Sequence, residues 1–213
     1  MKKFLNDIRY TENRVPLNKQ IINSVLILFL GIALGVFSKF LDCTPSNKLP
    51  YIFSYLDVSN FLGRLWVTIA LCVSIYSNSS LRAAINVFVF FAGMVTSYYL
   101  YSKYVAGFFP RSYAMIWIAF TMISPILAFI CWYAKGKSNL ALILSAMILA
   151  ILFNMTFVYG ILYFDIRSIL ELMTFVCAIV VLKRNTIKDT MLMFVLSCGI
   201  AFILNFVIPF SFG

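Results

Sequence analysis

Two long apolar runs joined by a short turn constrain the fold of this chain more than any other feature. The first run covers residues 83–104, the turn covers 105–113 and the second run covers 114–134. An α-helix needs about 20 apolar residues to cross a hydrocarbon layer of about 30 Å, because it rises 1.5 Å per residue. The turn is too short for a folded domain, so the two runs predict an antiparallel pair of membrane-spanning helices.

The composition extends this prediction to the whole chain. Hydrophobic residues make up 63% of the 213 residues and charged residues only 11%, whereas a water-soluble domain has about 25% charged residues. We therefore expect an integral membrane protein with a basic cytoplasmic segment at 1–20 and a single transmembrane domain at 21–213.

The apolar pattern predicts an all-α, polytopic bundle of about seven transmembrane helices. A polar interruption at 165–167 precedes the sixth helix, which is short, so the fifth and sixth helices can also be a bent or re-entrant pair. That alternative gives six crossings. The expected helices cover 21–41, 61–76, 82–104, 114–134, 140–164, the stretch after 167 up to 182, and 190–210.

The distribution of basic residues predicts the orientation. With a cytoplasmic N-terminus and seven crossings, most of the 17 Lys and Arg residues fall on the cytoplasmic side, as the positive-inside rule requires. The net charge of +10 lies in short loops between apolar runs and not on one water-facing surface, so it does not indicate a nucleic-acid binder. The expected partners are the lipid bilayer and anionic lipid head groups at the cytoplasmic face.

Several kinds of chemistry are excluded by the residues present. The chain has no histidine, which excludes Ser-His-Asp catalysis and HExxH zinc sites. It has no GxxxxGK[ST] loop for a nucleotide phosphate, and its cysteines show no metal-binding spacing. We expect no enzyme activity, no cofactor and no metal, so any ATP-driven step would need a partner ATPase subunit.

Polar and ionisable residues near the predicted outer ends of the helices form a candidate ligand-binding site. A charged residue costs about 2.5 to 3.5 kcal/mol at the centre of a membrane helix, but less near its ends, where the side chain can snorkel. An outward-facing vestibule and simple anchoring at the membrane interface therefore both remain open. The candidate residues are Arg64, Tyr98, Tyr101, Lys103, Arg111, Tyr163, Asp165, Arg167 and Glu171.

A second group of residues points to helix packing. Gly31 and Gly35 form a small-xxx-small pair, which lets another helix approach closely. They belong to a stripe of small and polar residues, and a face that lines a substrate path is the alternative reading of this stripe. The stripe comprises Ser24, Gly31, Gly35, Ser38 and Asp42. The residues predicted to pack helices together are Gly31, Gly35, Asn86, Gly93 and Asn205.

Five short motifs carry a resemblance to known sequences. They are RAAINVF at 82–88, SYYLYS at 97–102, GFFP at 107–110, ISP at 123–125 and WYAKGK at 132–137. Together they resemble a family of small bacterial polytopic membrane proteins that is defined by sequence and has no assigned activity. The resemblance covers about residues 21–140, and it implies a multi-pass protein of the bacterial plasma membrane.

Two functions fit these observations. The first is a transport-related protein or substrate-binding membrane subunit with an outward-facing polar vestibule, which would work with a partner membrane subunit or ATPase. The second is a non-transporting interaction, assembly or immunity protein that docks through 31–42 or through the basic inner loops.

Overall fold

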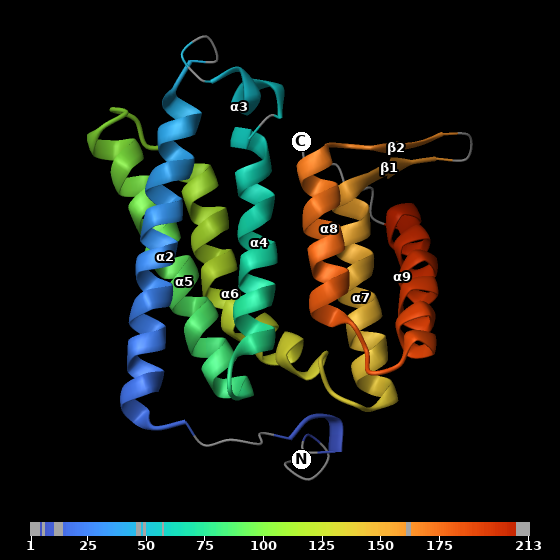
Figure 1. The fold of residues 1–213 in the computed structure, drawn as a ribbon. Helices are drawn as coiled ribbons and strands as arrows, with labels where there is room; N and C mark the ends of the chain where they lie inside the picture. The colour runs from blue at the N-terminus through green and yellow to red at the C-terminus, as the bar shows by residue number, and fades with distance from the viewer. Residues whose placement is uncertain are drawn as a thin grey trace. The chain divides into compact units, whose positions relative to one another are not determined.

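The computed structural model describes residues 5, 7–10, 15–45, 48, 50–56, 58–160 and 163–207, without the side chains of residues 54, 59, 60 and 64 (Figure 1). The described part of the chain is mostly helical, at 81%. The elements in the described part are α2 (Leu17–Cys43), α3 (Tyr51–Tyr55), α4 (Val58–Tyr76), α5 (Ser80–Tyr104), α6 (Arg111–Tyr133), α7 (Asn139–Thr156), β1 (Phe157–Tyr159), β2 (Phe164–Ile166), α8 (Ile169–Leu182) and α9 (Ile187–Val207).

Serine side chains fix where three of the helices begin. Ser79, Ser138 and Ser168 precede α5, α7 and α8, and each hydroxyl accepts a hydrogen bond from a backbone N–H in the first helical turn, at 3.2 to 3.3 Å. Such a cap satisfies one of the amide groups that have no partner at a helix start. Short polar turns therefore separate apolar runs that would otherwise read as continuous helices.

Among the described residues, five helices are long and apolar enough to cross a membrane, namely α2, α5, α6, α7 and α9. The apolar helices α4 and α8 are shorter, so the count of about seven crossings stays a prediction, as does the cytoplasmic N-terminus. Many large apolar side chains on the long helices are exposed, such as Phe29, Met122 and Val195 at 63 to 66%. Such surfaces are compatible with a membrane protein, in which lipid covers them.

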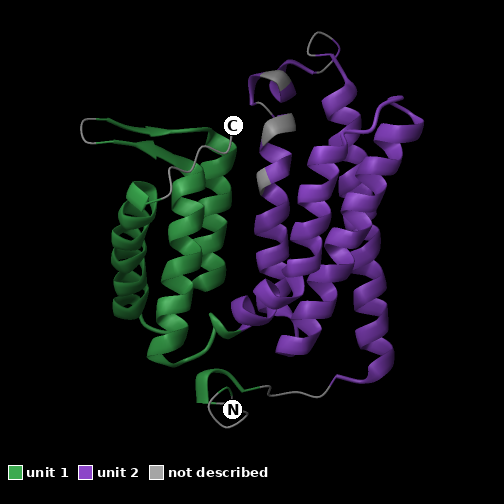
Figure 2. Cartoon of the chain, turned by 180° about the vertical axis from the view of Figure 1, so that it is seen from behind, with its two compact units in different colours: residues 1–10, 133–213 green, residues 11–132 purple. Residues whose placement is uncertain are grey.

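The chain forms two compact units (Figure 2). Unit 1 consists of residues 1–10 and 133–213, and unit 2 consists of residues 11–132. The predicted division into a basic segment at 1–20 and one transmembrane domain at 21–213 stays a prediction.

In unit 2, α2 packs closely against α5. Gly31 and Gly35 of α2 face the backbone of α5, and a Cβ atom at either glycine would overlap the carbonyl oxygen of Phe90 or Met94. From the other side, Gly93 of α5 faces Leu28. The contact is therefore between helix backbones, and it depends on residues that have no side chain at these points.

In unit 1, α7 packs against α8 and α9. After Thr156 the chain forms a two-stranded antiparallel hairpin, in which Phe157 pairs with Ile166 and Tyr159 with Phe164. The expected helix over 140–164 was therefore wrong in its last part, and the expectation of an all-α chain fails here. Phe157-Val158-Tyr159 followed by Gly160 favours a strand and a turn, because aromatic and β-branched residues suit a pleated sheet.

Candidate functional site

The predicted ligand-binding residues fall into two groups. Tyr98, Tyr101, Lys103 and Arg111 belong to unit 2, as does Arg64, whose side chain lies outside the described part. Tyr163, Asp165, Arg167 and Glu171 belong to unit 1. Each group is therefore considered within its own unit.

Tyr98 is part of a polar cluster that links α2 to α5. Its hydroxyl donates to Asp42 Oδ2 at 2.5 Å and accepts from Lys39 Nζ at 3.5 Å. Lys39 is only 5% exposed. Ser38 beside it accepts a hydrogen bond of 3.2 Å from the indole of Trp66 on α4. The cluster contains a buried cation and a carboxylate joined through one phenol.

The turn after α5 completes the enclosure of Lys39. Ser102 Oγ donates to the carbonyl of Phe108 at 2.8 Å, and Gly107 adopts a φ of 74°, which a residue with a side chain rarely does. The turn places the ring of Phe108 4.6 Å from Lys39 Nζ, and the ring of Tyr98 lies 4.9 Å away. Cation–π contacts of this kind offset part of the cost of burying the ammonium group.

The other predicted residues at this end of unit 2 lie apart from the cluster. Tyr101 is half-buried, and Lys103 Nζ lies 5.3 Å from the centre of the Tyr104 ring. Arg111 is exposed at the start of α6. The sequence pattern pointed to Tyr98 and, in the stripe of α2, to Asp42, but it gave no indication of Lys39, the cation that Tyr98 contacts.

In unit 1, the predicted residues belong to the hairpin and to the start of α8. Tyr163 is 60% exposed, and the Asp165 carboxylate accepts from the backbone N–H of Ile166 at 2.7 Å. Arg167 precedes the cap residue Ser168, and its backbone N–H donates to Thr156 at 3.0 Å. Arg167 therefore lies outside α8. Although it is four residues before Glu171, the two residues do not belong to one helix.

Glu171 is buried in the first turn of α8. Its backbone N–H donates to Ser168 Oγ at 3.3 Å, and Ser-x-x-Glu is the sequence of a capping box. A carboxylate at this position is also favoured by the positive end of the helix dipole. The Ser-x-x-Glu sequence therefore explains why a glutamate occurs in the first turn of α8.

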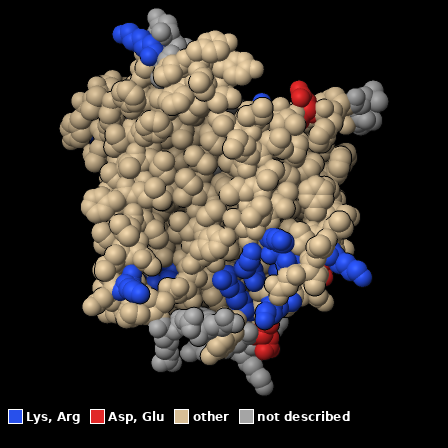
Figure 3. Space-filling view, viewed as in Figure 1, with Lys and Arg blue, Asp and Glu red and all other residues tan. Residues whose placement is uncertain are grey.

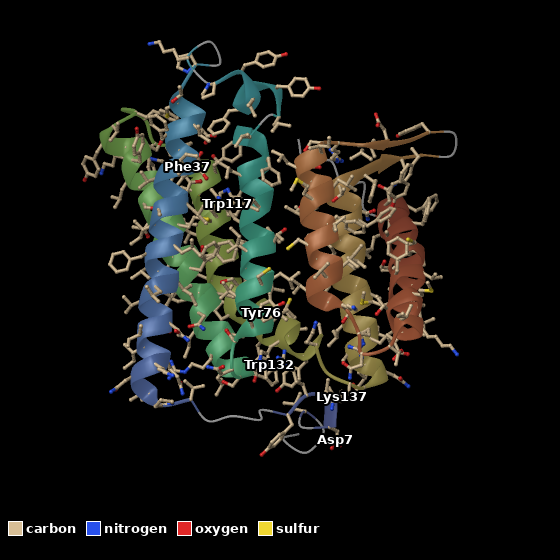
Figure 4. The ribbon with its side chains drawn as sticks, in the orientation of Figure 1. Asp7, Phe37, Tyr76, Trp117, Trp132 and Lys137 are labelled. Carbon is tan, nitrogen blue, oxygen red and sulfur yellow. The ribbon has the colours of Figure 1, made fainter. Side chains whose placement is uncertain are left out.

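A partly open cavity of about 300 Å³ lies in unit 2 at the end where α2 and α5 begin and α4 ends. Its lining contains amide, hydroxyl and aliphatic groups, and none of these side chains is charged. The lining residues are Asn23, Leu26, Ile27, Val73, Tyr76, Ser77, Asn78 and Asn86. Figure 4 shows Tyr76 and Trp132 near the lower end of α4.

Asn86 anchors the polar side of this cavity. Its Oδ1 accepts from Ser24 Oγ at 2.7 Å, and its Nδ2 donates to Ser77 Oγ at 3.1 Å. The carbonyl of Ser77 accepts in turn from the indole N–H of Trp132 at 2.7 Å. Asn86 is only 7% exposed, so this network fixes one wall in place.

Two further amides of the lining are available to a ligand. Asn23 and Asn78 are exposed, and neither side chain makes a hydrogen bond to the described part of the chain. A side-chain amide offers both a donor and an acceptor. The cavity can therefore hold a neutral molecule that carries hydroxyl or amide groups.

The cavity contains none of the nine predicted ligand-binding residues. Of the residues predicted to pack helices, only Asn86 lines it. The antiparallel order of the helices could have indicated this site from the sequence. In such an order, the starts of α2 and α5 lie at the same end of unit 2 as the end of α4. Asn23, Ser77 and Asn78 could have been grouped with Asn86 by that argument.

In unit 1, an amide also connects helices. Asn154 Nδ2 donates to the carbonyl of Ala201 on α9 at 3.1 Å, and its Oδ1 accepts from the hydroxyl of Tyr159 at 2.5 Å. Asn205, the residue predicted for this role, is half-buried near the end of α9. Among the described residues, no group of three or more Cys, Asp or Glu side chains is placed to hold a metal ion.

No protein-family model, curated protein or solved structure matches this chain. The resemblance to a family of bacterial membrane proteins stays a prediction. The function has to be argued from the geometry of the chain itself.

Proposed function

We propose that this chain is a multi-pass membrane protein that binds a small neutral solute in the cavity of unit 2, as a transporter or as the substrate-binding subunit of one. The observation that carries the proposal is the cavity itself. Its volume of about 300 Å³ is at the lower end of the range for small-molecule sites, which combine apolar walls with a few polar groups.

The polarity and charge of the lining residues indicate which class of solute the cavity can bind. Asn23, Asn78 and Tyr76 offer donors and acceptors, whereas Leu26, Ile27 and Val73 supply apolar walls. A charged solute would lose its hydration without gaining an opposite charge, which is costly. We therefore propose a compact polyol, sugar or amide as the ligand.

Binding is favoured over catalysis by the same lining. None of its side chains is an acid or base near neutral pH, so the cavity supplies no group for proton transfer. The proposal accordingly gives the chain no enzymatic role.

The charge distribution supports an orientation in which the N-terminus is cytoplasmic. The cavity lies at the end where α2 begins, so in this orientation it opens towards the cytoplasm of a bacterial cell. The proposed site therefore faces inwards, in contrast to the outward vestibule expected from the sequence.

One version of the alternative function is disfavoured by packing. Gly31 and Gly35 were candidates for a docking face, but both are in contact with α5. A partner helix would have to displace α5 to reach them.

The test is a ligand screen with the full-length protein in detergent, measured as a rise in the unfolding temperature. Neutral polyols, sugars and amides are compared with charged amino acids, because a ligand at 100 times its Kd stabilises the folded state by about 2.7 kcal/mol. Asn23→Ala and Asn78→Ala should lose this stabilisation, and Val73→Phe should block the cavity by filling it.

The matched control is Asn139→Ala, which removes an exposed amide at the start of α7 in unit 1. This variant should respond to the ligand as the unmodified chain does. The proposal fails if no neutral solute stabilises the protein, or if the stabilisation survives in all three cavity variants. Uptake of the bound solute by proteoliposomes then separates a transporter from a binding subunit.

A further inference from the structure

Three segments of unit 1 bring basic side chains together where α6 and α8 end. The backbone N–H of Lys137 donates to the carbonyl of Ile8 at 3.1 Å. Gly136 lies so close to Ile8 that a Cβ atom would overlap its carbonyl oxygen. The N-terminal segment is thus held on the turn after α6, which places Arg9 in that region.

The turns after α6 and α8 are joined by their basic side chains. Lys135 Nζ donates to the carbonyl of Val181 and, at 3.1 Å, to that of Lys183. Arg184 donates to the carbonyls of Ala134 and Ser138, at 3.1 and 3.3 Å. Val181 lies in the last turn of α8 and Ala134 directly follows α6. Carbonyl groups at the C-terminal end of a helix lack partners within the helix, and they attract cations.

These contacts hold cations near one another with few acids to balance them. The pKa of Lys135 is lowered by burial and further by the positive charges of Arg9, Arg184 and Lys183. Asp189 partly offsets the effect of burial on the pKa of Arg184. In the described residues of the three segments, the acids are Asp7 and Asp189, and the basic residues are Arg9, Lys135, Lys137, Lys183, Arg184 and Lys188. Figure 3 shows basic side chains gathered near the lower end of the molecule.

The surface next to this basic cluster is apolar. Leu140 and Ile143 on α7 are exposed, as are Ile187 and Met191 on α9. A charged group bound at the cluster would therefore have hydrocarbon-compatible surface beside it. A phospholipid has both parts, a phosphate and acyl chains, whereas a soluble phosphate compound has only the first.

We propose that the basic cluster of unit 1, formed by Arg9, Lys135, Lys137, Lys183, Arg184 and Lys188, binds the phosphate of an anionic phospholipid. The acyl chains lie along the exposed apolar side chains of α7 and α9. The phosphate reduces the repulsion between the cations, and its oxygens can accept charge-assisted hydrogen bonds from the ammonium and guanidinium groups of the cluster. This inference concerns unit 1 and is independent of the solute cavity in unit 2.

The test uses the double variant Lys137→Gln/Lys183→Gln in the full-length protein. Both side chains are exposed, and the hydrogen bonds of Lys135 and Arg184 are left in place. Bound phosphatidylglycerol is measured by native mass spectrometry and by the unfolding temperature in nanodiscs with and without that lipid. At about fivefold for each lost charge near a membrane surface, the affinity should fall about 25-fold.

The matched control is Lys103→Gln/Arg111→Gln, which removes two exposed charges from unit 2. It should keep the lipid. Equal retention of phosphatidylglycerol by both double variants overturns the proposal. If inorganic phosphate or glycerol phosphate stabilises the protein as strongly as the lipid does, the site is a general anion site and the lipid assignment is wrong.

Discussion

Lys39 is a charged side chain that is almost wholly removed from solvent in an apolar helix. Its ammonium group contacts two aromatic rings and the Tyr98 hydroxyl, which itself bonds to Asp42. The Tyr98 hydroxyl therefore accepts a hydrogen bond from the Lys39 ammonium group and donates one to the Asp42 carboxylate. Removal of one partner from a buried charged group usually costs more than the hydrogen bond contributed, because the remaining group stays desolvated.

Tyr98→Phe is therefore expected to lower the free energy of unfolding by about 1 to 3 kcal/mol. The ring and its contact with Lys39 are kept, and only the hydroxyl is lost. Tyr101→Phe on the same helix is the control, because the Tyr101 hydroxyl makes no hydrogen bond within the described chain. Chemical unfolding in detergent measures the difference, and equal effects of the two substitutions would refute this role for Tyr98.

The lowered pKa of Lys135 predicts a dependence of stability on pH. The unfolded chain, in which this lysine titrates near 10.5, binds more protons than the folded chain between the lowered pKa and 10.5. The free energy of unfolding should therefore rise with pH across this window, because the penalty for the buried charge disappears. Lys135→Met should remove the contribution of this lysine to the slope of unfolding free energy against pH. Tyrosines that titrate in the same range contribute equally to both chains, so the difference between the two slopes belongs to Lys135.

Added anionic lipid should reduce the same slope, because a bound phosphate favours the charged lysine. The measurement is unfolding in neutral detergent from pH 7 upwards, with and without phosphatidylglycerol. A slope that is identical in the unmodified chain and in Lys135→Met would contradict the assignment to this residue.

At the scale of elements, the α2–α5 pair is held by contact between backbones. Gly31 and Gly35 leave no room for side chains against α5. The apolar character of lipid provides little drive for helices to associate in a membrane, so close packing of this kind contributes much of the pairing energy.

Gly35→Ala is expected to force α2 and α5 apart and to lower the free energy of unfolding by about 1 to 3 kcal/mol, as overpacking does. Gly199→Ala in α9 is the control, since nothing lies within 4 Å of an added Cβ there. That substitution should be neutral or slightly stabilising, because alanine favours helix. Unfolding temperatures of both variants test the contrast, which fails if the two glycines respond alike.

Hydropathy predicted the long helices well because their limits coincide with polar turns. The expected helix over 82–104 corresponds to α5 (Ser80–Tyr104), and that over 114–134 to α6 (Arg111–Tyr133). The hairpin was missed because Phe157, Val158 and Tyr159 are as apolar as the helix before them, so hydropathy does not mark where helix changes to strand.

The nine residues predicted to bind a ligand stay a prediction, and none of them lines the cavity of unit 2. In unit 2, charge and tyrosine content indicated residues such as Tyr98 and Arg111, at the end where α5 ends and α6 begins. The cavity is lined by neutral amides at the opposite end of unit 2, and a single amide in an apolar helix reads as a packing residue. Only the three-dimensional contacts of Asn86 with Ser24 and Ser77 show these polar groups together.

At the scale of the whole molecule, the order of the helices and the distribution of charge predict a topology. In seven crossings, turns such as 105–110 and 134–138 would lie on opposite sides of the membrane. The positive-inside rule assigns the basic second turn to the cytoplasm.

This topology is tested by labelling single cysteines in intact cells with a maleimide that does not cross membranes. In a chain with Cys43→Ser and Cys177→Ser, which removes the two exposed native thiols of the described residues, Val105→Cys should react from outside. Lys137→Cys should react only after the membrane is opened. The reverse pattern would invert the predicted orientation, and the cavity of unit 2 would then face outwards.

The hairpin after α7 has a consequence for the bilayer itself. Because ten residues of chain are used by the hairpin and its ends, α8 has only 14 residues, and a helix of that length rises about 21 Å. This is about 9 Å less than the usual hydrocarbon thickness, whereas α2 has 27 residues and exceeds it. If α8 crosses the bilayer as the prediction of seven crossings requires, this hydrophobic mismatch would be relieved by thinning the bilayer beside α8 and by tilting α2. Membrane thickness would then act unequally on these two helices, and the lipid chain length that suits α8 would be shorter than the one that suits α2.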